Sequence, residues 1–234
     1  MARGTQFLQL VTMLRDELGR SNSVAVGVDD LPSLKQTINR VYESLYDEYD
    51  WPHLRQVFSR ITLAAGQRYY NLPAQLDYDR IETAAVWYSG EPQPILRGIG
   101  FEEYEGYDSE KGERSEPALR WDIRWTGAAE QLEIWPIPSS NDQKLQFTGI
   151  TKFERLVNDS DLCLLDDNLV VLFCAAELLA RQKSQDARSK LEQAQQRLYR
   201  LKGRSQSGGR MIRMGMGNDS GQIQLSGKAV VRVK

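Results

Sequence analysis

The chain is poor in the residues that usually do chemistry, with one histidine and two cysteines among its 234 residues. A single histidine excludes metal centres built from several histidines, and Cys163 and Cys174 lack the spacing of a zinc site. Both cysteines stand in apolar surroundings, which predicts buried, reduced thiols. No apolar run approaches the roughly 18 residues of a membrane-spanning helix. The N-terminus carries charges at Arg15, Asp16 and Glu17 and has no small-residue cleavage site, so it is not typical of a signal peptide.

Catalytic motifs are missing as well. The histidine, His53, stands in "DEYDWPHLR", where Asp47 or Asp50 could orient it as a general base. However, no serine or cysteine nucleophile stands in a recognisable elbow, and there is no Walker or GxSxG pattern. Because His53 follows a Trp-Pro step at a helix exit, we interpret it as structural. The sequence therefore predicts no catalytic residue, no metal and no cofactor, and hence no enzyme.

One acidic segment leaves a metal-dependent alternative open. Carboxylates recur along it at Glu102, Glu103, Glu105, Asp108, Glu110, Glu113 and Glu116. Such groups bind divalent cations, but the spacing is not that of an EF-hand, and Lys111 and Arg114 interrupt it. A solvated acidic face is the interpretation that charge runs favour.

Charge is distributed unevenly along the chain. Residues 203–234 hold six basic residues and one acidic residue, a net charge of +5, whereas the 24 basic and 31 acidic residues before them give −7. An acidic body with a basic tail indicates a partner. A nucleic-acid-binding protein that grips DNA with this tail is the alternative function, although no aromatics are interleaved with its arginines for base stacking.

Two helices are expected near the N-terminus. The first spans residues 5–18, with Thr5 as its N-cap and Gly19 as its stop. The second opens at Asp30 or Ser33, and its apolar residues recur every three or four positions. It ends near Pro52, which disfavours helical geometry at the residue before it.

From residue 57 the apolar period becomes that of strands. Residues 57–63 and 68–73 are predicted to form a hairpin around "AAGQ", and residues 80–90 and 93–99 a second pair. Further strands are expected at residues 118–127, 131–138 and 144–153. Together these patterns predict an antiparallel β domain of about six or seven strands.

One long helix is predicted after this domain, from Asp166 or Asp167 to Gly203, with a length of ~50 Å. Its first half is apolar on nearly every side and should be buried. Its second half keeps only a narrow apolar seam: Ala187, Leu191, Ala194, Leu198 and Leu201. A seam of this width suits one neighbouring helix, either from another subunit or from the chain's own first helix.

The expected fold class is therefore α+β. The N-terminal helix pair (residues 1–55) and the long helix (residues 156–203) would form a helical bundle, into which the antiparallel β domain (residues 56–155) is inserted. Residues 204–234 would form an extended, basic C-terminal arm. Because this arm keeps apolar residues among its glycines, we interpret it as a peptide that orders on another protein.

Several stretches in this order resemble a known family. A helix pair closes on "YDWPHLR", and "LPAQLDYDRI" follows with the pattern LPxxxDxxRI. Then come "EIWPIP" and a helix beginning "DDNLVVLFCAAELLARQK". Over residues 5–202 the chain is similar to the head-to-tail adaptor proteins of tailed bacteriophages, also called head-completion or tail tubular proteins.

That resemblance implies a structural protein of the virion neck, made in the cytoplasm of the host bacterium. It implies a homo-oligomeric ring, a dodecamer, that joins the phage portal protein to a downstream tail or nozzle protein. Double-stranded DNA would pass through the ring, and no membrane is involved. The seam residues would form the subunit interface. The portal-docking arm would comprise Arg210, Met211, Ile212, Arg213, Met214, Ile223, Leu225, Val230, Val231 and Val233.

Overall fold

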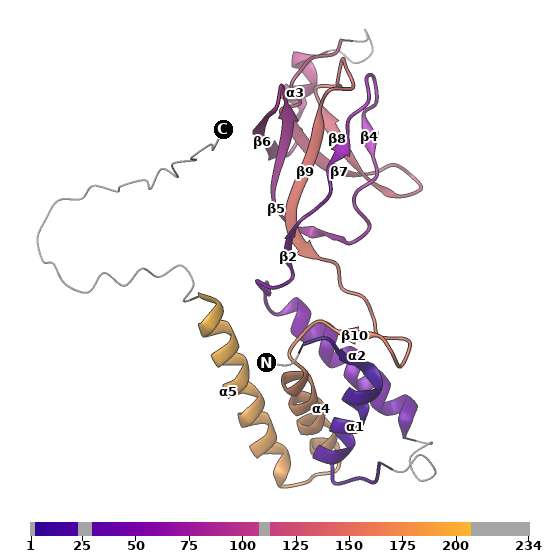
Figure 1. Cartoon of the computed structure of the whole chain (residues 1–234), viewed down its shortest axis with the longest axis vertical. Helices are drawn as coiled ribbons and strands as arrows, with labels where there is room; N and C mark the ends of the chain where they lie inside the picture. Colours follow the sequence, from indigo (N-terminus) through magenta and orange to yellow (C-terminus); the bar gives the residue numbers. More distant parts are fainter. Residues whose placement is uncertain (1–2, 23–29, 108–112, 207–234) are drawn as a thin grey trace, which may run out of the picture.

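The computed structural model describes residues 3–22, 30–107 and 113–206. Most of the helices gather at one end of the molecule, and the large sheet lies at the other end together with the short helix at residues 101–106 (Figure 1). The helices within the described residues are α1 (Phe7–Glu17), α2 (Leu31–Asp47), α3 (Phe101–Gly106), α4 (Asp167–Arg181) and α5 (Asp186–Gln206). We call α1, α2, α4 and α5, with strands β1 (Thr5–Gln6) and β10 (Leu162–Cys163), the helical region. None of the described helices has the length and apolar character needed to cross a membrane.

Eight strands form the sheet region. They are β2 (Arg55–Val57), β3 (Ile61–Thr62), β4 (Tyr69–Tyr70), β5 (Leu76–Tyr88), β6 (Glu91–Arg97), β7 (Arg120–Trp125), β8 (Glu130–Trp135) and β9 (Lys144–Thr151). Their order is β2-β9-β5-β6-β7-β8-β4, with β3 also on β9. The pairs are antiparallel except β6 with β7, which run parallel.

The sheet curls so that its two halves enclose one core. Trp121 of β7 meets Phe147 of β9 edge to face, with ring centroids 5.3 Å apart. Phe147, Leu132 and Leu145 are fully buried there, so side chains from β8 and β9 share one interior. The β5–β6 hairpin predicted from the sequence is confirmed, with Tyr88 opposite Glu91.

The first predicted hairpin is wrong. Strand β3 pairs with β9, and β4 pairs with β8, so residues 57–63 and 68–73 do not pair with each other. The turn between them is held by a distant loop instead: the Gly66 amide donates to the Pro138 carbonyl at 2.9 Å and the Ala65 amide to Asn141 at 2.8 Å. These contacts carry the two strands to different parts of the sheet.

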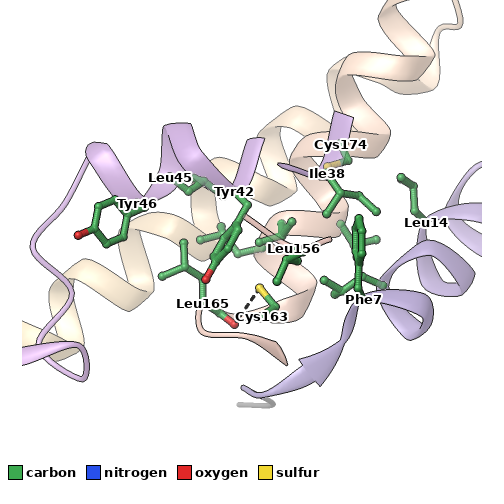
Figure 2. Packing of buried hydrophobic residues seen from close by; sticks show 14 of the residues in the cluster. Phe7, Leu14, Ile38, Tyr42, Leu45, Tyr46, Leu156, Cys163, Leu165 and Cys174 are labelled. Carbon is green, nitrogen blue, oxygen red and sulfur yellow. Dashed lines mark hydrogen bonds between the residues drawn. The ribbon is translucent and has the colours of Figure 1, made fainter. Parts of the chain in front are cut away.

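The helical region has its own core, in which Figure 2 shows Phe7 of α1 and Tyr42 of α2 among the side chains that close around Cys163. Both cysteines are free and buried, as the sequence predicts. Burial raises the pKa of the Cys163 thiol to about 12 and that of Cys174 further. Neither sulfur is therefore a ready nucleophile.

The single long helix is also wrong, because it breaks at residues 182–185 into α4 and α5. Lys183 adopts a left-handed backbone with φ 55°, and the Ser184 amide donates to the Leu179 carbonyl at 3.0 Å, which closes a Schellman-type end. The chain then turns back, and α5 lies along α4 (Figure 1). Helix α5 also continues past Gly203, the expected stop.

The expected fold class is thus corrected. The chain is a mixed fold in which a large curled sheet of eight strands dominates, beside five helices within the described residues. It is not a helical bundle with an antiparallel β domain inserted. The sequence pattern predicted the positions of the strands but not which strands pair. Pairing between distant segments makes the sheet the principal element of the fold.

Arg80 of β5 joins the two regions. Its guanidinium donates to the carbonyls of Tyr46 at 2.8 Å and Asp47 at 2.9 Å, which lie at the C-terminal end of α2. A cation at this end satisfies carbonyls that lack helical partners and complements the helix dipole. The Tyr46 hydroxyl lies 2.6 Å from the Asp77 carboxylate, also of β5. The sheet is therefore fastened to the end of α2.

Candidate functional site

His53 lies near the junction between the helical region and the sheet region, just after α2. Its Nε2 donates to the Leu164 carbonyl at 2.8 Å, linking the exit of α2 to the segment after β10. Burial lowers the pKa of His53, so the neutral ring is favoured. The nearby Asp47 and Asp50 lie within 4 Å of Arg80 rather than orienting the imidazole. This geometry supports a structural histidine.

The described part of the acidic segment is used for structure too. Glu103 accepts the Gly100 amide at the start of α3 at 3.0 Å and pairs with Arg120 at 3.2 Å. No cluster of three or more potential metal-ligating side chains occurs among residues 3–22, 30–107 and 113–206. Asp108 and Glu110 lie outside these ranges.

The helical region contains an open apolar groove between α2, α4 and α5, with a volume of about 630 Å³. Its floor is α4, where Phe173, Ala176 and Ala180 stand three to four residues apart and so share one helix face. Small alanines on this face leave a hollow instead of a ridge. Ala187 and Leu191 of α5 form one wall.

The opposite wall of the groove is the outer face of α2, with Arg40, Ser44 and Glu48. Charges stand along its rim. Glu177 of α4 accepts hydrogen bonds from Arg40 and, at 2.6 Å, from Arg181. One carboxylate is thus shared by two guanidinium groups.

A second ion pair holds the third helix of the groove in place. Asp166, only 2 % exposed, caps α4 by accepting the Leu169 amide at 3.0 Å. The same carboxylate accepts two hydrogen bonds from Arg197 of α5, at 2.6 and 2.9 Å. Such bidentate, charge-assisted pairs fix orientation as well as distance. The ion pair therefore fixes how α5 lies on α4.

The structure places the residues of the predicted seam in two different environments. Ala194, Leu198 and Leu201 are buried in the chain's own helical core. Leu191, 40 % exposed, and Ala187 line the groove instead. The predicted portal-docking arm lies outside the described residues.

Sequence reasoning missed the groove because the groove depends on the turn between α4 and α5. The turn has no glycine or proline, since Lys183 takes the left-handed position that glycine usually fills. A weak signal was present in Ser184, whose hydroxyl accepts the Asp186 amide at 3.3 Å and opens α5. Serine before an acidic residue is typical of a helix start.

Comparison with known proteins gives one finding that bears on function. A search of curated proteins finds no match. The family model described as SU10 adaptor protein matches residues 5–216, which is most of the chain. That family is structural, which argues against an enzyme, and it connects head and tail components of phage particles. By this match the chain belongs to the SU10 adaptor protein family, a family of phage head-to-tail adaptors.

Proposed function

We propose that this chain is one copy of a dodecameric ring in the neck of a tailed phage, between the portal protein and the next tail or nozzle protein. The observation that carries the proposal is the family match over residues 5–216. The ring would continue the channel through which double-stranded DNA leaves the head. An acidic body, with net charge −7 before residue 203, supports this role because like charge repels DNA phosphates.

The open groove also supports assembly. Exposed apolar surface with a polar rim is a common feature of protein interaction sites. Here the ion pair between Asp166 and Arg197 fixes α5 against α4, so the groove between these helices is part of the folded chain. A ring gives every copy a neighbour and so a means to cover it.

The C-terminal arm is proposed to dock on the portal. Its basic and apolar residues, from Arg210 to Val233, suit a groove on another protein. The test is a chain that ends at Gln206, which keeps Leu201 and the rest of the helical core. We expect this truncation to remain folded by circular dichroism and to lose binding to purified portal rings. Undiminished portal binding by the truncation would contradict the docking role.

The ring itself is tested by the mass of the full chain, measured alone and with candidate portal rings by light scattering and electron microscopy. We expect a ring of fixed copy number on the portal. A chain that does not bind its cognate portal would contradict the adaptor ring.

A nucleic-acid-binding role is the second candidate, supported by the +5 charge of residues 203–234. Electrostatic DNA binding falls steeply as salt rises. Titration of a labelled duplex at low and high salt separates the two roles. Binding that is lost in the chain ending at Gln206 would favour the second candidate, and absence of binding at low salt would remove it.

A further inference from the structure

We propose that, in the free chain, residues 211–216 lie in the α2/α4/α5 groove of the same copy and keep a ring neighbour out of it. We call these residues the groove segment. They belong to the arm that docks on the portal, so portal binding withdraws them and opens the groove to the neighbour. The inference rests on the proposed ring and portal docking, and it adds a regulation to them: the ring closes only on the portal.

Charge does not select the occupant of the groove, because the charged side chains around it are already paired. The pairs are Arg40 and Arg181 with Glu177, Lys202 with Glu48, and Arg188 with Glu192. Most of the other lining residues are apolar: Val41, Leu45, Phe173, Ala176, Ala180, Ala187 and Leu191. The occupant is therefore selected by the fit of apolar side chains.

The groove segment has an apolar side when its backbone is extended. Side chains then alternate, so that Ile212, Met214 and Met216 point one way. Met211 and Arg213 point the other way, toward water. Methionine is unbranched and flexible, and so it fills irregular hollows such as the one that the small alanines of α4 leave.

The length of this apolar side matches the length of the groove. Ile212 and Met216 are four residues apart, which is ~13 Å in an extended chain. The α2 wall of the groove runs from Arg40 to Glu48, eight residues or ~12 Å along the helix. Three alternating side chains can thus fill the groove from end to end.

Helix α5 delivers the chain to one end of the groove. Lys202 of α5 pairs at 2.8 Å with Glu48, which lines the groove. Gln206, where α5 ends, is one turn further on, or ~6 Å. Ile212 follows six residues later and can reach ~20 Å. Residues 207–209 are Ser-Gly-Gly, which suits a reversal of chain direction.

The same copy is favoured over a neighbour as the source of the segment. A peptide joined to its site by a short linker has an effective concentration of about 1 mM, which a dilute second copy does not reach. The family match also runs to residue 216, so it includes the groove segment and leaves out residues 217–234. If the isolated segment binds with a Kd of about 0.1 mM, the linked segment favours the groove about tenfold, so it adds little stability and can be exchanged.

The test compares two full-length variants that differ in which side of the groove segment is changed. Ile212→Asp places a charge on the apolar side and should free the groove, whereas Met211→Asp changes the opposite side and is the matched control. A labelled peptide of residues 207–217 is titrated into each by fluorescence anisotropy. We expect Ile212→Asp to bind the peptide about tenfold more tightly than the wild type or Met211→Asp, because its own segment no longer competes.

A second change locates the peptide on the groove. Ala180→Arg, added to the Ile212→Asp chain, should abolish peptide binding. Val57→Arg in the same chain is the control and should leave binding unchanged, since Val57 is 64 % exposed but lies in the sheet region. Ala180 is exposed as well, so neither change disturbs a core. Circular dichroism of each variant confirms its folding.

Sedimentation velocity of the same proteins, up to about 1 mM, tests the effect on assembly. We expect the wild type and Met211→Asp to stay monomeric and Ile212→Asp to form larger species, which Ala180→Arg should remove. An Ile212→Asp chain that binds the peptide and stays monomeric would show that the segment does not hold back the ring.

Three results would overturn the inference: no peptide binding by Ile212→Asp, equal peptide affinity in Ile212→Asp and the wild type, or binding that survives Ala180→Arg. A wild type that excludes the peptide but sediments as larger species would assign the segment to a neighbouring copy instead. None of these measurements uses portal rings, so a failure of portal docking leaves them unchanged. Absence of peptide binding beside intact portal docking contradicts this inference alone.

Discussion

The two regions of the molecule use their apolar residues differently. In the sheet region, the curled strands close upon each other, and residues such as Leu132 and Phe147 are fully buried between them. In the helical region, the same kind of core is complete on one side of α4, yet another side leaves an apolar groove open. The difference teaches that the sheet encloses its core within one copy, whereas the helices leave part of their apolar surface in an open groove.

The largest effect on stability is expected when Leu198 of α5 is compared with Leu191, because the sequence pattern places both in one apolar seam. Leu198→Ala removes a side chain from the helical core and should lower the free energy of unfolding by about 2–5 kcal/mol. Leu191→Ala lies in the groove and should change it by less than about 1 kcal/mol. Urea titrations of both variants check this. Equal losses would mean that the groove is closed within one copy.

These two leucines also show how far sequence reasoning reaches. A heptad-like stripe predicts that both face a neighbour, because periodicity reports which face is apolar. It does not report whether the neighbour is the same chain. The turn at Lys183 decides this, and no glycine marks it. Strand positions were likewise readable from residues such as Trp121, whereas the distant pairing of β3 with β9 was not.

Family membership was readable for a different reason. The motifs "YDWPHLR" and "LPAQLDYDRI" contain residues that fasten the two regions together. His53 donates from Nε2 to the Leu164 carbonyl at 2.8 Å, and Arg80 caps α2. Such residues depend on a junction between distant segments, so their order along the chain carries information that composition lacks.

The next effect tests that junction from the sheet side. A Cβ on Gly149 of β9 would stand 2.9 Å from the Arg80 carbonyl oxygen, so Gly149→Ala must push β5 away. We expect a loss of about 1–3 kcal/mol in the free energy of unfolding. Gly203→Ala is the control, because nothing lies within 4 Å of that position and alanine favours helix. If both variants were as stable as the wild type, the β5–β9 contact would be looser than the structure indicates.

A smaller and opposite effect is expected at the turn that makes the groove. Lys183 has a positive φ of 55°, a conformation that costs non-glycine residues free energy. Lys183→Gly should therefore raise the free energy of unfolding by about 0.5–1 kcal/mol. Lys183→Ala is the control and should bring no such gain. A loss of stability in the glycine variant would show that the turn depends on the lysine side chain.

The smallest effect is a pH dependence at the junction of the two regions. Burial lowers the pKa of His53, with Arg3 adding a weaker contribution, so the folded chain disfavours the protonated ring. The stabilisation is complete above the ordinary histidine pKa of about 6.5 and is lost as pH falls through the folded value. Because His53 is the single histidine, urea titrations between about pH 7 and pH 5 isolate it from the carboxylates, which titrate lower. His53→Gln keeps an amide donor for the Leu164 carbonyl and should flatten this dependence; an unchanged slope would assign it to another group.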